Sequence, residues 1–470
     1  MKKLLFLAPI FLLACSEKPV EWISSTNDLK WETEKNLALK DAYANAPFDL
    51  AVTGDTAQQI DGFGGCFNEL GWDALNMLSS GAKDSILQEL FTPNTGFNFT
   101  ICRMPMGAND YSRMFYSYNE TAGDFEMKNF SIAHDTAGLL PYIKEAMKYN
   151  PKLQVWGSPW CPPSWMKTNN HYACHRDTVQ NDLPIAGEGM EGKNQFIMKE
   201  QYLKAYALYF AKFIQAYRAE GVNLNAVHVQ NEPNSCQVFP SCVWTASALR
   251  DFIGKYLGPE LIKQELDAQI WLGTIERPSV EKIETVLTDS LSAKYVKGVG
   301  FQWAGKGAIP GVHKKYPNMK LMQTETECGD GSNDWKAAEH TWGLMLHYLT
   351  NGANSYMYWN IILDETGKSQ WGWKQNSMIS VDSKTRKAKF NPEFYLMKHL
   401  SHFVQPGSKR LITEGWEDVL AFANPDGSTN LLIYNPFEKV KDINIRVKEQ
   451  SFSTKIQPKS FNSFTIKAKI

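Results

Sequence analysis

Two glutamates in this 470-residue chain have the residue type and placement for acid–base or nucleophilic chemistry. Glu232 lies in Asn231-Glu-Pro233, directly after a short run that alternates apolar and polar residues, and Glu325 ends the apolar-rich run 319–325. A pair of carboxylates is the minimum equipment for cleaving a glycosidic bond, because one protonates the leaving oxygen while the other attacks carbon or activates water. Glu232 taken alone is also consistent with an acidic residue in a surface turn, and acidic strand ends such as Glu325 are common in α/β proteins.

The residues before Glu232 predict a helix followed by a strand. Apolar and aromatic residues recur at helical spacing from Leu203 to Tyr217, and Gly221 is typical of a helix end. Residues 226–230 then alternate with the period of a strand. Pro233 cannot donate to a sheet ladder, so the strand stops there. Glu232 is therefore expected at the carboxyl end of a strand, where barrel enzymes keep their catalytic groups.

The wider pattern predicts an α/β fold with two parts. A strand-then-helix unit recurs over residues 59–392, which indicates a (β/α)8 TIM barrel. Residues 70–90 are expected to be broadly helical. From 393 to 470 the chain turns to short strands separated by turns such as 424–427, which is typical of an all-β sandwich. Residues 22–58 are expected to add strands to a small β module.

The first residues have the pattern of an export signal. Lys2 and Lys3 precede an apolar stretch, 4–13, that is too short to span a bilayer. The sequence Leu-Leu-Ala-Cys15 resembles the lipobox of bacterial lipoproteins, so we expect 1–15 to be a signal peptide, Cys15 to be lipidated and 16–21 to be a tether. The alternative is an ordinary secretory peptide with an incidental cysteine. The expected location is the bacterial cell envelope, with the side of the membrane left open.

Charge and motif content exclude several classes of function. A net charge of -1 and a pI of about 6.8 give no reason to expect nucleic acid or a direct membrane surface as partner. The spacing of His171, Cys174 and His175 fits no standard metal site, and no phosphate-binding or dinucleotide motif is present. No metal or organic cofactor is expected. Cys236 and Cys242 flank a short loop beside Glu232, and in an oxidising compartment we hypothesise that they form a disulfide.

These residues together resemble glycoside hydrolase family 30 along nearly all of the mature chain. The resemblance rests on several segments in the same order, each weak alone and highly specific together: 61–65, 103–106 with Asp110, 158–165 with 167–169, 231–233, 317–325 and 359–360. It implies a (β/α)8 barrel with a β-sandwich built from both ends of the chain. It also implies a retaining mechanism that uses no metal or organic cofactor.

The resemblance assigns roles to individual residues. Glu232 matches the acid/base and Glu325 the nucleophile, with Glu327 competing for the second role. Glu325 is preferred because it ends the apolar strand and because Gly329 then falls at the family's glycine position. The expected substrate-pocket residues are Arg103, Asp110, Trp160, Asn231, Trp303, Glu327 and Trp359.

Two departures from the family bear on the substrate. The family's glucosylceramidases carry His-Trp-Tyr where this chain has Gln302-Trp-Ala304, and Glu327 adds a third carboxylate near the pair. The expected substrate is a β-linked glucoside, oligosaccharide or glycolipid, which leaves a β-glucosidase, a glucosylceramidase-like enzyme and a β-1,6-glucanase open. The alternatives are a xylan-directed hydrolase of the same family and a lipid-anchored carbohydrate-binding protein that lacks catalysis.

Overall fold

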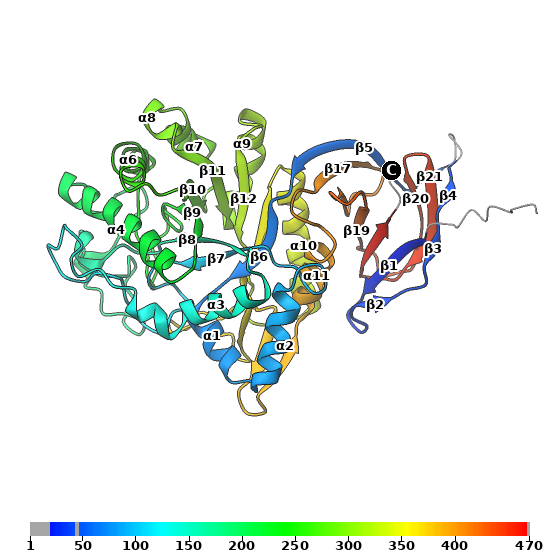
Figure 1. Ribbon diagram of the computed structural model, residues 1–470, viewed down its shortest axis with the longest axis horizontal. Helices are drawn as coiled ribbons and strands as arrows, with labels where there is room; N and C mark the ends of the chain where they lie inside the picture. Colours follow the sequence, from blue (N-terminus) through cyan, green and yellow to red (C-terminus); the bar gives the residue numbers. More distant parts are fainter. Residues whose placement is uncertain (1–18, 43–46, 468–470) are drawn as a thin grey trace, which may run out of the picture.

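Eight parallel strands close into a barrel that forms one lobe of the computed structural model, which describes residues 19–42 and 47–467 (Figure 1). Neighbouring strands of the barrel follow chain order, and the first pairs with the last. The barrel strands are β6 (Gly62–Cys66), β7 (Ile101–Pro105), β8 (Gln154–Ser158), β9 (Leu224–His228), β10 (Gln269–Ile275), β11 (Val296–Gln302), β12 (Lys320–Glu325) and β13 (Ser355–Asn360). The predicted TIM barrel is confirmed.

Helices surround the barrel strands on the outside (Figure 1). The α-helices of this lobe are α1 (Glu69–Asn76), α2 (Ser80–Phe91), α3 (Leu139–Tyr149), α4 (Glu200–Ala219), α5 (Ala246–Asp251), α6 (Gly258–Lys263), α7 (Val280–Leu287), α8 (Ser290–Ala293), α9 (Ile309–Lys315), α10 (Trp335–Thr350) and α11 (Pro392–Ser401). The helical stretch expected over 70–90 consists of α1 and α2, and Ser79 caps α2 by accepting a hydrogen bond from the Ala82 backbone N–H.

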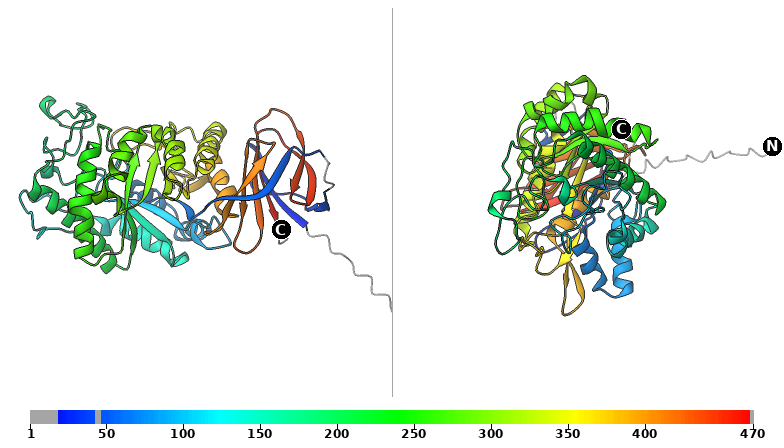
Figure 2. Two further views of the ribbon diagram at one scale, coloured as in Figure 1. Left: turned by 90° about the horizontal axis from the view of Figure 1, so that it is seen from above. Right: turned by 90° about the vertical axis from the view of Figure 1, so that its left-hand side faces the viewer.

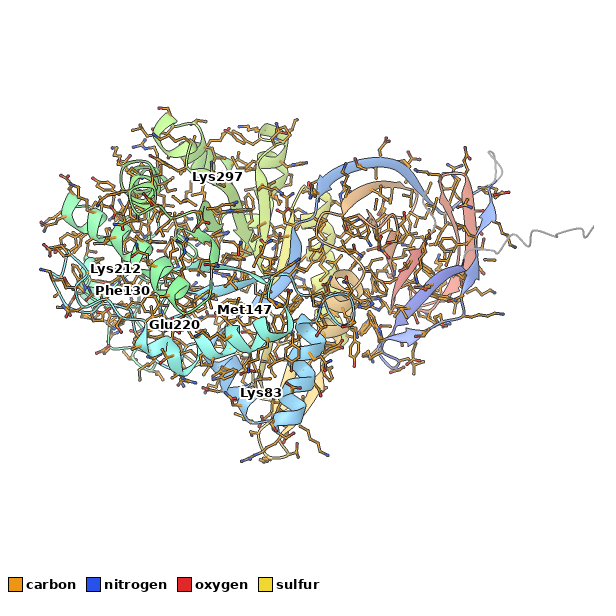
Figure 3. All side chains as sticks on the ribbon, viewed as in Figure 1. Lys83, Phe130, Met147, Lys212, Glu220 and Lys297 are labelled. Carbon is orange, nitrogen blue, oxygen red and sulfur yellow. The ribbon has the colours of Figure 1, made fainter. Side chains whose placement is uncertain are left out.

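Helix α4 shows how the aromatic pattern sets the packing. Tyr206, Phe210 and Phe213 are fully buried on its inner face, whereas Glu220 beyond its end lies on the outer surface (Figure 3). Gly221 follows with φ of +83°, a left-handed conformation that costs glycine little and lets the chain turn into β9. The helix therefore delivers the chain to the strand that carries Glu232.

The second lobe is a β-sandwich made from both ends of the chain (Figure 2). In it β1 (Pro19–Ser25) pairs antiparallel with β22 (Ser460–Ile466), and β5 (Leu50–Gln59) pairs with β17 (Lys409–Glu414) and β20 (Lys441–Val447). The remaining strands are β2 (Glu32–Thr33), β3 (Leu37–Ala38), β4 (Lys40–Asp41), β18 (Val419–Ala423), β19 (Thr429–Asn435) and β21 (Gln450–Ile456). Strand β5 then leads into β6, so the lobes share one continuous segment.

The boundaries differ from the expected ones at two places. The region predicted as sandwich from 393 opens with most of α11, which packs against α10 and β6 of the barrel and against β22 of the sandwich. The first strand after α11 is β17. The expected tether, 16–21, overlaps β1, which begins at Pro19. The expected signal peptide and Cys15 lie outside the described residues. Among the residues described, no helix has the length and apolarity needed to cross a bilayer.

A small three-stranded sheet extends the barrel lobe beyond β13. It consists of β14 (Ile362–Asp364), β15 (Ile379–Asp382) and β16 (Lys387–Phe390). The loop between β14 and β15 carries Trp373 and Gln375 to the carboxyl end of the barrel, where both line the cavity described next.

Candidate active site

A cavity of about 260 Å³ opens at the carboxyl ends of the barrel strands, and both predicted catalytic glutamates line it. Glu232 follows β9 and Glu325 is the last residue of β12. Glu232 has φ of +48°, a left-handed conformation that is costly for a glutamate and that clusters at functional sites. The cavity is lined by Asp110, Trp160, Asn231, Glu232, Ser235, Gln237, Phe239, Glu276, Arg277, Trp303, Glu325, Trp373 and Gln375.

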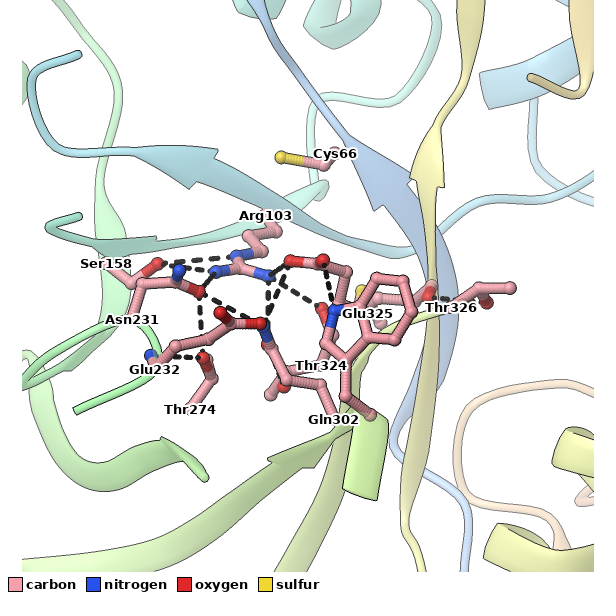
Figure 4. A network of polar contacts seen from close by, with 12 residues as sticks. Cys66, Arg103, Ser158, Asn231, Glu232, Thr274, Gln302, Thr324, Glu325 and Thr326 are labelled. Carbon is pink, nitrogen blue, oxygen red and sulfur yellow. Dashed lines mark hydrogen bonds and ion pairs between the residues drawn. The ribbon is translucent and has the colours of Figure 1, made fainter. Parts of the chain in front are cut away.

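Arg103 of β7 lies beside the two glutamates and contacts Glu325 and Asn231 (Figure 4). It is fully buried, and its Nη1 forms a salt bridge of 2.7 Å with Glu325 Oε2. Its Nη2 donates to Asn231 Oδ1 at 2.7 Å and to Ser158 Oγ at 3.1 Å. The guanidinium also stacks on Trp160, 4.4 Å from the ring centroid. Arg103 therefore lies outside the cavity lining and binds Glu325.

Trp303 holds the other oxygen of Glu325. Its indole Nε1 donates to Glu325 Oε1 at 3.1 Å, directly after β11 ends. Trp303 has φ of +47°, so a second left-handed, non-glycine residue stands beside the carboxyl pair. Gln302, just before it, contacts both Glu232 and Glu325 through its side-chain amide.

Burial raises the pKa of both catalytic carboxyl groups. At Glu325 the positive charge of Arg103 opposes that rise, and the negative charge of Glu232 adds to it. At Glu232 the largest opposing effect is a hydrogen bond from Gln302. The salt bridge with Arg103 favours the ionised form of Glu325, whereas Glu232 forms no salt bridge with Arg103.

The expected pocket residues Asp110 and Trp160 line the cavity, whereas Trp359 lies behind its wall. Asp110 lines the cavity, and its Oδ1 is a buried acceptor without a hydrogen-bond partner in the described part of the chain. Burial, and next the charge of Glu325, raise the pKa of Asp110 well above its ordinary value. Trp160 forms a wall of the cavity, whereas Trp359 lies behind it with ring centroids 5.3 Å apart. Trp359 thus supports the wall and does not line the cavity.

Glu327 points away from the pair. It forms a salt bridge with Lys306 and accepts a hydrogen bond from His340 at 3.0 Å, and it is absent from the cavity lining. Burial raises its pKa, but the contacts with His340 and Lys306 outweigh burial, so the net shift is downward. The structure therefore places Glu327 outside the cavity lining, and Glu325 is the carboxylate that lines the cavity with Glu232.

Several lining residues were missed in the sequence. Glu276 directly follows β10 and accepts hydrogen bonds from the Asn234 backbone N–H at 2.8 Å and from Ser235 Oγ at 3.0 Å. Burial, and next the charge of Glu232, raise its pKa to about 7. Its position at the end of an apolar strand is the same signal that located Glu232 and Glu325. Arg277 beside it and Trp373 on a loop carry no comparable signal.

The expected disulfide does not form. Cys236 and Cys242 are both free thiols. Cys242 is buried and lies near the buried ammonium of Lys167, whereas the half-buried Cys236 hydrogen-bonds with Cys174. Both thiols lie near Cys174 and Lys167, but neither is in a disulfide, so the Cys236–Cys242 hypothesis is wrong.

A barrel of this kind, with two carboxyl groups lining one cavity at the carboxyl ends of its strands, has the arrangement expected of a glycoside hydrolase. The chain belongs to glycosyl hydrolase family 30. The model of that family's TIM-barrel domain matches residues 60–404, and the model of its beta sandwich domain matches 407–464. The resemblance seen in the sequence is thereby confirmed.

Relatives with described activities cover most of the chain. The lysosomal acid glucosylceramidase of Mus musculus is 28% identical over 429 residues, which are 85% of this chain and 79% of the mouse protein. Endo-1,6-beta-D-glucanase BGN16.3 of Trichoderma harzianum is 28% identical over 400 residues, 81% of this chain and 78% of the fungal protein. The structure of the endo-beta1,6-glucanase BT3312 has a TM-score of 0.81 at 23% identity and covers 96% of this chain and 100% of its own.

Proposed function

We propose that this glycoside hydrolase cleaves β-linked glucosides with retention of configuration, with Glu232 as acid/base and Glu325 as nucleophile. The observation that carries the proposal is the contact of one nitrogen with both carboxyl groups. Gln302 Nε2 lies 3.0 Å from Glu232 Oε1 and 3.2 Å from Glu325 Oε2. The two accepting oxygens are therefore closer together than the roughly 6.5–9.5 Å of inverting enzymes, and no water fits between nucleophile and sugar.

In the first step Glu325 attacks the anomeric carbon while Glu232 protonates the leaving oxygen. A new bond forms between the carboxylate oxygen and carbon, and the bond from carbon to the leaving oxygen breaks. Glu325 is poised for attack because Arg103 keeps it ionised. Glu232 is poised to donate because burial raises its pKa.

In the second step Glu232 takes a proton from water, and the resulting hydroxide equivalent displaces Glu325 from the anomeric carbon. Glu325 carries no charge as an ester, so it no longer raises the pKa of Glu232. Glu232 is thus a weaker acid while Glu325 is charged and a base once that charge is gone. Two inversions at one carbon restore the original configuration.

The residues around Glu232 favour a sugar as the leaving group. The leaving group lies on the side of the acid/base, where Ser235, Gln237, Glu276 and Arg277 line the cavity. Sugar hydroxyls can hydrogen-bond with these groups, whereas the alkyl chains of a ceramide would bury them without partners. Of the activities named for the relatives, cleavage of β-1,6-glucan fits this lining better than cleavage of a glucosylceramide.

The same proposal includes export and a lipid anchor at Cys15. It is supported by the short apolar stretch after Lys2 and Lys3 and by the Leu-Leu-Ala-Cys motif. An anchored enzyme would meet its substrate at the cell envelope, held there by acyl chains and not by a spanning helix.

A substrate panel tests the proposal. The purified protein is incubated with β-1,6-glucan, β-1,3-glucan, xylan, glucosylceramide and an aryl β-glucoside, and the products are separated by chromatography. We expect β-1,6-linked oligosaccharides or glucose from the first, with β-configured product seen by NMR at early times. Preferred release of xylose oligomers would favour the xylan-directed alternative. Binding without hydrolysis of any member would favour a carbohydrate-binding protein.

A further inference from the structure

Gln302, the last residue of β11, lies between the two catalytic carboxyl groups (Figure 4). Its side chain is fully buried, and its Nε2 is within hydrogen-bonding distance of Glu232 Oε1, Glu325 Oε2 and Asn231 Oδ1. Asn231 Oδ1 already accepts from Arg103 at 2.7 Å and from Thr274 at 2.9 Å. The two amide hydrogens of Gln302 are therefore available to the two carboxyl groups.

The orientation of this amide is fixed by its other end. Gln302 Oε1 accepts a hydrogen bond from Thr324 Oγ1 at 2.9 Å and one from Arg103 Nη1 at 3.3 Å. An arginine can only donate, so the oxygen of the amide must face Arg103 and the nitrogen must face the carboxyl groups. A flipped amide would bring its oxygen against two carboxylate oxygens and its hydrogens against the guanidinium.

We propose that Gln302 is a positioning residue whose amide holds Glu232 and Glu325 at one separation and selects the oxygen of each that reacts. This role rests on the proposed function, in which the two glutamates are the catalytic pair. Glu232 Oε1 accepts from Gln302, which leaves Oε2 as the oxygen that carries the transferred proton. Glu325 Oε2 accepts from both Gln302 and Arg103, which leaves Oε1, held only by Trp303, as the attacking oxygen.

The hydrogen bonds that the Gln302 amide donates to Glu232 and Glu325 also change in relative strength between the two steps. In the resting site the amide donates to both carboxyl groups. After glycosylation Glu325 is a neutral ester and a weaker acceptor, so the amide hydrogen bond to Glu232 strengthens in relative terms. A donated hydrogen bond favours the ionised carboxylate, which is the form of Glu232 that acts as the base in the second step.

The test replaces the amide by an apolar side chain of similar length, Gln302→Met, and measures kcat/KM on an aryl β-glucoside against pH. We expect kcat/KM to fall about 10- to 100-fold, since the hydrogen bonds lost are to charged groups. Activity requires protonated Glu232, so it is lost as pH rises through the pKa of that group. Removing the donor raises this pKa, and the basic limb of the profile moves up by about one unit.

Two further variants separate this role from a loss of structure. Thr324→Val removes the hydroxyl that orients Gln302, so the basic limb of the kcat/KM profile should move in the same direction by a smaller amount. This variant keeps the test decisive if Gln302→Met does not fold. Gln323→Met changes a buried glutamine on β12 that touches neither carboxyl group, and its limbs should stay in place. Basic limbs that coincide in wild type, Gln302→Met and Thr324→Val overturn the role of Gln302.

The same experiment distinguishes failure of this role from failure of the proposed function. Covalent labelling of Glu325 by an activated fluoroglucoside in wild type, together with unmoved pH limbs in the variants, leaves the function standing and rejects the bridge. Absence of hydrolysis and of labelling in wild type rejects the function and the bridge with it.

Discussion

Replacing Arg103 by methionine should protonate the nucleophile at neutral pH. Arg103 is fully buried, and its salt bridge to Glu325 is 2.7 Å long. Removing one partner of a buried ion pair costs about 3–5 kcal/mol, because the remaining charge is left uncompensated. If Glu325 takes up a proton instead, that free energy corresponds to a rise of roughly 2–4 units in its pKa.

The sign of the effect follows from the role of Glu325. The nucleophile must be ionised, so activity is lost as pH falls through its pKa. In Arg103→Met this acidic limb of the pH profile should move to higher pH by roughly 2–4 units, and kcat/KM at about pH 6 should fall by about 100- to 10,000-fold. Arg103→Lys keeps a charge but loses the planar fork that reaches both Glu325 and Asn231, so its limb should move less.

The assay is kcat/KM on an aryl β-glucoside between about pH 4 and pH 9, with thermal melting followed by circular dichroism. Arg113→Met is the matched control, because Arg113 pairs with Asp73 in a partly exposed position outside the cavity. The melting temperature of Arg113→Met can change, but the acidic limb of its kcat/KM profile should stay at the wild-type pH. An acidic limb that stays at the wild-type pH in folded Arg103→Met would refute the assignment of Arg103 as the group that keeps Glu325 ionised.

Three further predictions concern Glu232, Glu393 and Cys15. Glu232→Ala should still be glycosylated by substrates with good leaving groups, and azide should restore its turnover and give a β-glycosyl azide; no effect of azide on that variant would count against Glu232 as the acid/base. Burial raises the pKa of Glu393 to about 7, so protonation of this carboxyl group stabilises the fold below about pH 4.5. This contribution, about 3 kcal/mol, is lost as pH rises to about 7. The free energy of urea unfolding of Glu393→Gln should lack this pH dependence, and equal dependence on pH in both proteins would contradict the prediction. Mass spectrometry of the mature N-terminus should find an acylated Cys15, whereas an unmodified terminus at another residue would reject the anchor.

The sequence located Glu232 and Glu325 because strand ends leave a strong local signal. An apolar run that stops at a polar residue marks the carboxyl end of a barrel strand, and the barrel then brings such ends to one face. Glu276 follows the same rule at the end of β10 and was passed over, because no family motif drew attention to it. The signal was present in the sequence for all three glutamates.

Other features depend on tertiary contacts that the sequence does not show. Glu327 is only two residues from Glu325, yet Lys306 and His340 hold it outside the cavity. Trp373 reaches the cavity from a loop whose path is set by the small sheet beyond β13. Cys236 and Cys242 are near in sequence, but which neighbours their side chains meet depends on how the loop folds.

The measurement that tests the account most directly is the identity of the residue trapped by an activated fluoroglucoside. The fluorine slows both steps, and the good leaving group lets the first step proceed, so a covalent glycosyl-enzyme accumulates. Peptide mapping by mass spectrometry should find the sugar on Glu325 in wild type and no adduct in Glu325→Ala. An adduct on Glu327 or Glu232, or release of product with inverted configuration, would contradict the assignment of Glu325 as the nucleophile of a retaining hydrolase.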